Sequence, residues 1–146
     1  MRRAVVSITR AEGAVEEVQA SLDGLAAHHA VPPDALCDMQ IALDEALTNI
    51  LTHGFDDGEP HRIEVTLAIE PTTIRAEIED DCAAFDPLSA AAPDLTASLK
   101  DRRVGGLGVH FMRRLMSEVS YSRIGPRNRL VLRRALETGG TEDGNA

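Results

Sequence analysis

The chain has 146 residues, of which 43% are hydrophobic and 27% are charged, and this composition suits one compact domain with a single core. Its formal net charge of -9 and isoelectric point near 4.9 exclude a general electrostatic attraction to nucleic acid. The N-terminal residues lack the roughly 7–15 apolar positions of a signal peptide, and no apolar run reaches the ~18 that span a membrane, so we expect a cytoplasmic protein without membrane contact.

The first predicted elements are a strand and a helix. Residues 3–9 are apolar and rich in β-branched side chains, which is typical of a strand. Within residues 11–30, apolar side chains recur at helical spacing, and the sequence VPP then ends the helix. The recurring positions are Val15, Val18, Leu22 and Leu25.

A second helix is predicted from Pro33 to just before Gly54. Its apolar stripe holds to helical spacing at Leu36, Met39, Leu43, Leu47 and Ile50. Glu45 and Asn49 lie away from this stripe and one above the other, because a helix turns by about 100° per residue. Their near neighbours include Ala42 and Ala46, so this second face is not plainly exposed to water.

The next segments predict an antiparallel hairpin and a long loop. Residues 61–70 and 73–80 alternate apolar and polar side chains around a turn at 71–72, as strands with one buried face do. Asp80 ends the second strand. Residues 86–104 are rich in Pro, Ala, Ser and Asp without a sustained period, which indicates an irregular connection.

The glycine-rich sequence GGLG introduces a third helix, predicted at residues 107–117. Two strands are predicted to follow, at 118–123 and 129–136. Residues 139–146 offer nothing to bury, so we expect a disordered tail and one domain over residues 1–138.

The two cysteines, Cys37 and Cys82, are too few and too far apart in the sequence for a disulfide framework or a zinc site. We therefore interpret them as two reduced thiols. His53 is expected to pack or cap at the end of its helix, because no second metal ligand at a suitable spacing is visible.

Four features follow one another in a definite order: E-x-x-x-N on a helix, an acidic strand end, a long connection and a glycine-rich turn that opens a helix. Backbone N–H groups in such a turn can approach an anion closely, and the start of the helix favours phosphate. The carbonyl oxygen of Asn49 could hold a divalent cation, and Glu45 could accept a proton. These parts together indicate a nucleotide site.

The segments ALDEALTNILTHGF, DDCAAFDP and GGLGVHFMRRLMSEVSY resemble the N box and the two glycine boxes of the GHKL ATPases, and specifically the short anti-sigma factor serine kinases. The resemblance runs from about residue 36 to residue 133. It implies an α/β two-layer sandwich of the Bergerat type, with a mixed, mostly antiparallel sheet covered on one face by helices.

The resemblance also implies roles for individual residues. Glu45 would be the general base and Asn49 the Mg²⁺ ligand. Asp80 would hydrogen-bond the adenine amino group of ATP. A loop that serves as a lid would line the phosphates, and this loop contains Gly106, Leu107 and Gly108.

The implied reaction is transfer of the γ-phosphoryl group of ATP to a serine of an anti-anti-sigma partner with a STAS domain. Phosphorylation would release the kinase to bind and silence a sigma factor. The resemblance also allows a homodimer. No direct contact with nucleic acid is implied.

One position departs from the family pattern. The D-x-G that follows the strand reads Asp80, Asp81, Cys82 here, and a further glycine is replaced within Ala83 and Ala84. A cysteine adds bulk where glycine allows close approach of a ligand. The alternative function is therefore a non-catalytic protein-binding regulator with a degenerate nucleotide site. A histidine-kinase catalytic region is a weaker alternative, because the chain leaves no room for the helical dimerisation domain.

Overall fold

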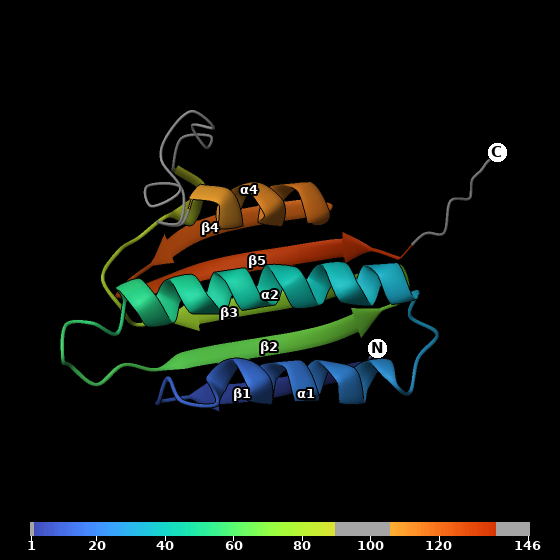
Figure 1. Ribbon diagram of the computed structural model, residues 1–146, viewed down its shortest axis with the longest axis horizontal. Helices are drawn as coiled ribbons and strands as arrows, with labels where there is room; N and C mark the ends of the chain where they lie inside the picture. The colour runs from blue at the N-terminus through green and yellow to red at the C-terminus, as the bar shows by residue number, and fades with distance from the viewer. Residues whose placement is uncertain (1, 90–105, 137–146) are drawn as a thin grey trace.

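The computed structural model describes residues 2–89 and 106–136, and Figure 1 shows that they form a sheet with helices along one side. In chain order the elements are β1 (Arg2–Ile8), α1 (Ala14–Ala26), α2 (Pro33–His53), β2 (Ile63–Glu70), β3 (Thr73–Asp80), the short 3-10 turn η1 (Pro87–Ser89), α4 (Gly106–Leu115), β4 (Glu118–Ile124) and β5 (Arg127–Ala135).

The sheet has five strands in the order β1-β2-β3-β5-β4, and all four neighbouring pairs are antiparallel. The expectation of a mixed sheet was therefore wrong for the part of the chain that the structure describes. Tight turns connect β2 to β3 and β4 to β5, and such turns can join only antiparallel strands. The second turn contains Gly125 at φ 58, a conformation that glycine adopts without steric cost.

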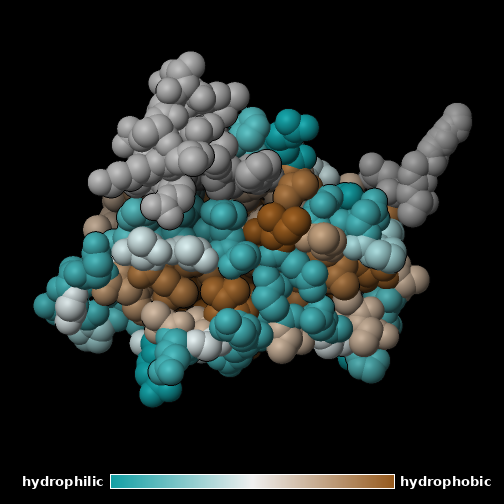
Figure 2. Space-filling view, in the orientation of Figure 1, coloured by the Kyte–Doolittle hydropathy of each residue, from teal (hydrophilic) through white to brown (hydrophobic). Residues whose placement is uncertain are grey.

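The helices cover one face of the sheet, which confirms the two-layer sandwich (Figure 1). The helix α1 lies against β1 and β2, α2 runs across the middle of the sheet between the other two helices, and α4 lies toward β4. On the outer surface of the helix layer, hydrophilic side chains alternate with smaller apolar patches (Figure 2).

The hydrophobic core fills the space between the two layers and consists of aliphatic side chains and methionines. Side chains that are fully buried include Leu22, Met39, Leu43, Leu47, Leu67, Ile78, Met112 and Leu132. The centre of the predicted stripe on α2 is thus confirmed, while its ends, Leu36 and Ile50, are only partly buried. Burial of this apolar area from water is the main force that holds helices and sheet together.

The N-terminal end of α2 is also fixed to the sheet by charge. Arg134 of β5 donates from Nε to Asp38 at 2.9 Å and approaches Asp34 at 3.6 Å. Its side chain is only 18% exposed, so this pairing is partly shielded from solvent. The contact joins the N-terminal part of α2 to β5, and the far end of the helix carries the candidate site.

The second face of α2 is not a water face. Ala42, Ala46 and Asn49 are all buried, and Glu45 is half-buried. The first helix begins later than its predicted start at residue 11, because Gly13 precedes it at φ 75, a left-handed conformation that does not continue a helix, and it ends at Ala26 instead of residue 30.

The outer parts of two predictions fall beyond the described residues. Most of the predicted connection at 86–104, and the whole of the predicted tail at 139–146, lie there. Among the residues that the structure describes, no helix combines the length and the apolar character needed to cross a membrane.

Candidate functional site

A cavity of about 310 Å³ lies beside the C-terminal half of α2, between that helix, the end of β3 and the strands β4 and β5. Small-molecule sites typically enclose roughly 300–1,000 Å³, so this volume falls at the lower end of that range. Its lining is mostly apolar with a few polar groups. The described lining residues include Asn49, His53, Asp80, Cys82, Phe85, Met112, Tyr121 and Asn128.

Asp80 is the buried carboxylate of this cavity. It is 5% exposed and lies on the core face of β3, where the sheet register pairs it with Ile63 on one side and with Asn128 on the other. Its Oδ1 accepts hydrogen bonds from the backbone N–H of Cys82 at 3.0 Å and from Nδ2 of Asn128 at 2.9 Å. Both bonds fix the direction in which this carboxylate faces.

Asn128, which the sequence analysis did not identify, connects several parts of the site. Besides Asp80, its Nδ2 donates to the carbonyl oxygen of Ala83 at 3.0 Å. Its Oδ1 accepts from the backbone N–H of Phe85 at 3.2 Å and from the hydroxyl of Tyr121. One amide thus holds the segment that follows β3 against β5. The only sequence signal was a polar side chain at the start of RNRLVL, on the face that the alternation assigns to the core.

Cys82, the departure from D-x-G, lines the cavity without filling it. Its side chain packs against Gly54, since a Cβ on Gly54 would lie 2.5 Å from the Cys82 sulfur. The absence of a side chain at Gly54 thus makes room for the thiol. Burial, followed by the nearby carboxylate of Asp80, raises the pKa of the Cys82 thiol to about 12, so the group stays protonated at neutral pH.

Asn49 and Glu45 occupy different positions relative to the cavity. Asn49 is 9% exposed and lines it, whereas Glu45, one helical turn earlier, is not among the described lining residues. Burial, together with the neighbouring charge of Asp44, raises the pKa of Glu45 above its ordinary value of 4.5. A carboxylate with a raised pKa is a better proton acceptor, which suits a general base.

The predicted phosphate-binding glycines are only partly described. The helix α4 begins at Gly106, so Gly106, Leu107 and Gly108 form its first turn, while Gly105 lies outside the described residues. The free N–H groups of a first helical turn favour anions. From the same helix, the fully buried Met112 reaches the cavity.

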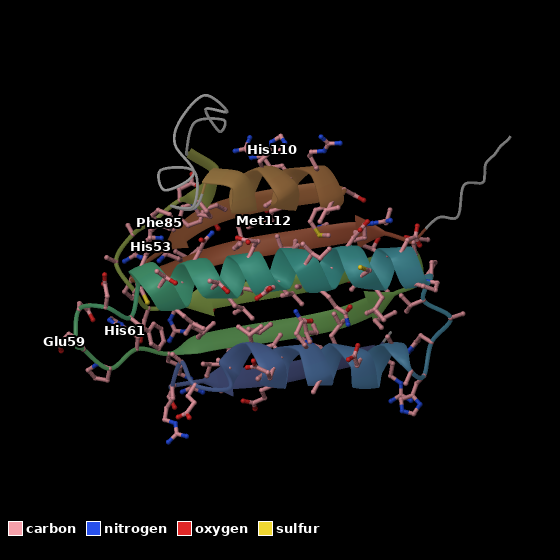
Figure 3. The ribbon with its side chains drawn as sticks, viewed as in Figure 1. His53, Glu59, His61, Phe85, His110 and Met112 are labelled. Atoms are coloured by element: carbon pink, nitrogen blue, oxygen red, sulfur yellow. The ribbon has the colours of Figure 1, made fainter. Side chains whose placement is uncertain are left out.

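His53 and Phe85 lie beside each other at the end of α2 (Figure 3). Their ring centroids are 5.9 Å apart, and both residues line the cavity. Phe85 is 48% exposed, which is unusual for a phenylalanine. The prediction that His53 packs at the helix end is consistent with this contact.

The chain is similar to several known proteins. A family model described as the histidine kinase-like ATPase domain matches residues 8–134. The serine/threonine-protein kinase BtrW of Bordetella bronchiseptica is 39% identical over 94 residues, a match that covers 64% of this chain and 66% of that protein. The anti-sigma F factor of Clostridium novyi is 28% identical over 86 residues, which cover 59% of this chain and 60% of that protein.

A solved structure, that of the RsbU and RsbW domains of Rv1364c from Mycobacterium tuberculosis, has a similar fold. Its TM-score to this chain is 0.64 with 17% sequence identity, over 92% of this chain and 33% of that chain. At this identity the similarity concerns the fold alone. The chain spans 66% and 60% of the lengths of the two curated relatives.

Proposed function

The chain belongs to the histidine kinase-like ATPase family, and we propose on that basis that it binds ATP and transfers the γ-phosphoryl group to a serine of a protein partner. The observation that carries this proposal is the buried Asp80 carboxylate, held by Asn128 in the wall of a mostly apolar cavity. Such a cavity accepts a flat, weakly polar ring, and a single fixed carboxylate gives it orientation.

Asp80 is the proposed acceptor for the adenine amino group. A carboxylate has no proton to donate, so it pairs with the amino group of adenine and would meet the carbonyl oxygen of guanine with repulsion. Because Asn128 and the Cys82 N–H already fix one oxygen of Asp80, the carboxylate needs no reorganisation when the base arrives.

The side chain of Asn49, near the end of α2, is a suitable ligand for Mg²⁺. Asn49 offers an amide oxygen, and Mg²⁺ on phosphates needs only one or two protein oxygens besides water. When bound, this ion would neutralise part of the charge of the phosphates. The first turn of α4, with Gly106, Leu107 and Gly108, is the proposed contact for the same phosphates.

Glu45 is the proposed general base. It stands one turn from Asn49 on α2, so both side chains share a face of the helix. Its raised pKa strengthens its affinity for the proton that the serine hydroxyl releases. Phosphoryl transfer needs little further chemistry from the protein beyond positioning and charge.

The proposed partners follow from the relatives, one of which is named a protein kinase and another an anti-sigma factor. We propose that the serine belongs to an anti-anti-sigma protein with a STAS domain, and that the kinase released by phosphorylation binds a sigma factor. Because a sigma factor acts in transcription, we propose that the protein works in the cytoplasm.

The test is phosphoryl transfer from ATP to a purified STAS-domain protein of the same organism, followed as phosphoserine. The Glu45→Gln variant should bind ATP normally but transfer about 10²–10⁴-fold more slowly, which is the usual contribution of a general base. The Glu17→Gln variant removes an exposed carboxylate of α1 instead, away from the cavity, and should transfer at nearly the wild-type rate.

Nucleotide binding is tested separately. The Asp80→Asn variant should bind ATP about tenfold to a hundredfold more weakly, because a hydrogen bond to a charged group contributes about 1.5–3 kcal/mol. Undiminished transfer by Glu45→Gln would overturn the role of Glu45. Wild-type protein that shows no ATP binding at millimolar concentration would instead support the non-catalytic alternative.

A further inference from the structure

A group of side chains that can ligate a metal lies at the edge of the candidate cavity, where the loop after α2 meets the end of β3 and where Asp57 and Cys82 also line the cavity. His61 comes from that loop, and Asp81 and Cys82 come directly after β3. One ligand atom of each residue lies within 4.8 Å of the other two. We call these three residues, together with Asp57, the His61 cluster.

His61 is held in an orientation typical of a metal-binding histidine. Its Nε2 lies 2.9 Å from both carboxylate oxygens of Asp57, and its ring packs against Phe55 with centroids 5.5 Å apart. Its Nδ1 faces Asp81 Oδ1 at 3.2 Å. Metal-binding histidines usually donate one ring N–H to a carboxylate, which fixes the tautomer and leaves the other nitrogen for the ion. Here Asp57 occupies the place of that carboxylate.

The other two ligands are also positioned by the backbone. Asp81 Oδ1 accepts the backbone N–H of Arg62 at 3.0 Å, which ties the carboxylate to the start of β2. Cys82 is 3% exposed, and Gly54 leaves space for its sulfur. The cluster is therefore assembled from two chain segments, the loop after α2 and the residues after β3, that are held in place by the fold.

We propose that His61 Nδ1, Asp81 and Cys82 Sγ bind a zinc ion and that Asp57 orients the imidazole. A nitrogen, an oxygen and a sulfur ligand match zinc, whereas Mg²⁺ and Ca²⁺ take oxygen ligands almost exclusively. Three protein ligands leave a fourth tetrahedral position for water or another ligand. The proposal does not depend on ATP binding or on kinase activity.

Binding requires a small local contraction and the loss of protons. Ligand atoms around a tetrahedral zinc stand about 3.4–3.7 Å apart, so side-chain rotation of Cys82 or Asp81 must bring the atoms closer by about 1 Å. The Cys82 thiol gives its proton to water as the zinc–sulfur bond forms, and any proton on His61 Nδ1 is released in the same way.

The sequence pattern concealed this arrangement. The two cysteines do not have the sequence spacing of a zinc site. The third proposed ligand, His61, lies about twenty positions before Asp81, in the loop that precedes β2. The cysteine in place of the glycine of D-x-G supplies the sulfur ligand, without which the cluster would be an ordinary ion pair between a histidine and two carboxylates.

The experiment is titration of the untagged, metal-free full chain with Co²⁺ in the absence of nucleotide. Cobalt replaces zinc at such sites and gives a sulfur-to-metal charge-transfer absorption when a thiolate binds it. We expect one equivalent to produce this absorption and Zn²⁺ to abolish it by displacement. The absorption should disappear in Cys82→Ser and persist in Cys37→Ser, which removes the exposed cysteine on α2 as a matched control.

Asp57→Asn should retain the absorption while Co²⁺ affinity falls about 10–100-fold, as expected for loss of a partner that orients the ligand. A wild-type chain without the absorption, or a Cys82→Ser variant that keeps it, would overturn the proposal. Circular dichroism checks that each variant is folded, and His61→Gln provides a second loss-of-site variant should Cys82→Ser be misfolded. Because no ATP is present, a negative result here leaves the proposed kinase activity untouched.

Discussion

Substitution of Asn128 by alanine removes the amide that joins β5 to Asp80 and to the segment after β3. The hydrogen bond to the Asp80 carboxylate should contribute about 1.5–3 kcal/mol, and those to the backbone of Ala83 and Phe85 about 0.5–1.5 kcal/mol each. Such contributions are not fully additive, and water from the adjoining cavity can replace some of them. We therefore expect the free energy of unfolding to fall by about 3 kcal/mol.

The assay is urea denaturation followed by circular dichroism, with Tyr121→Phe as the matched control. That variant removes only the hydroxyl that donates to Asn128 Oδ1, so it should lose about 1 kcal/mol. The alanine variant should also bind ATP more weakly, because Asp80 is no longer fixed. If Asn128→Ala lost no more stability than Tyr121→Phe, the amide would not be the central connection of the site, and the reasoning would be wrong.

Three further predictions concern packing and charge. Gly54→Ala places a methyl group 2.5 Å from the Cys82 sulfur and should lower the free energy of unfolding by about 1–3 kcal/mol. The loss should be clearly smaller in a Cys82→Gly background, and equal losses in both backgrounds would contradict the packing of Cys82 against Gly54. Burial raises the pKa of Glu77, but Arg129 and Arg75 lower it by more, so the pKa lies below its ordinary value of 4.5. The ionised Glu77 therefore stabilises the fold above pH 4.5, and this contribution is lost as pH falls through the lowered pKa. The difference in unfolding free energy between wild type and Glu77→Gln should accordingly shrink over that acidic interval, and a difference that grows there would reject the assignment. If Glu45 is the base, the single-turnover transfer rate should fall as pH drops through its raised pKa, whereas the residual rate of Glu45→Gln should lack this step.

Much of the fold could be predicted from the sequence, because the helices and strands carry strong periodic patterns. The stripe of α2 and the alternation in β2 and β3 report directly on which side chains leave water. The pairing of the strands was harder to predict from the sequence. Only contacts between distant segments determine that β5 lies between β3 and β4, and the fully antiparallel arrangement differs from the mixed sheet that the family resemblance implied.

The candidate site was predictable where one short segment carries it and not where several segments meet. Glu45 and Asn49 share a helix face, so their relation can be read from a spacing of four. Asn128 acts only because the sheet register places it beside Asp80, 48 positions earlier. His61 likewise reaches Cys82 only through the pairing of β2 with β3. Neither contact between these distant residues produces a recognisable pattern in the local sequence.

The sheet register has a consequence for how the chain folds. It places Ile63, Asp80 and Asn128 side by side across β2, β3 and β5. A slip of one residue in either pairing would turn Asp80 or its partner to the opposite face of the sheet, so the pocket exists only in the native register. Because β5 follows the other four strands of the described sheet in the sequence, a ribosome-bound intermediate that lacks it has no completed cavity. If the cavity binds nucleotide as proposed, the ligand can therefore stabilise the completed protein by mass action but cannot guide the earlier steps of its folding.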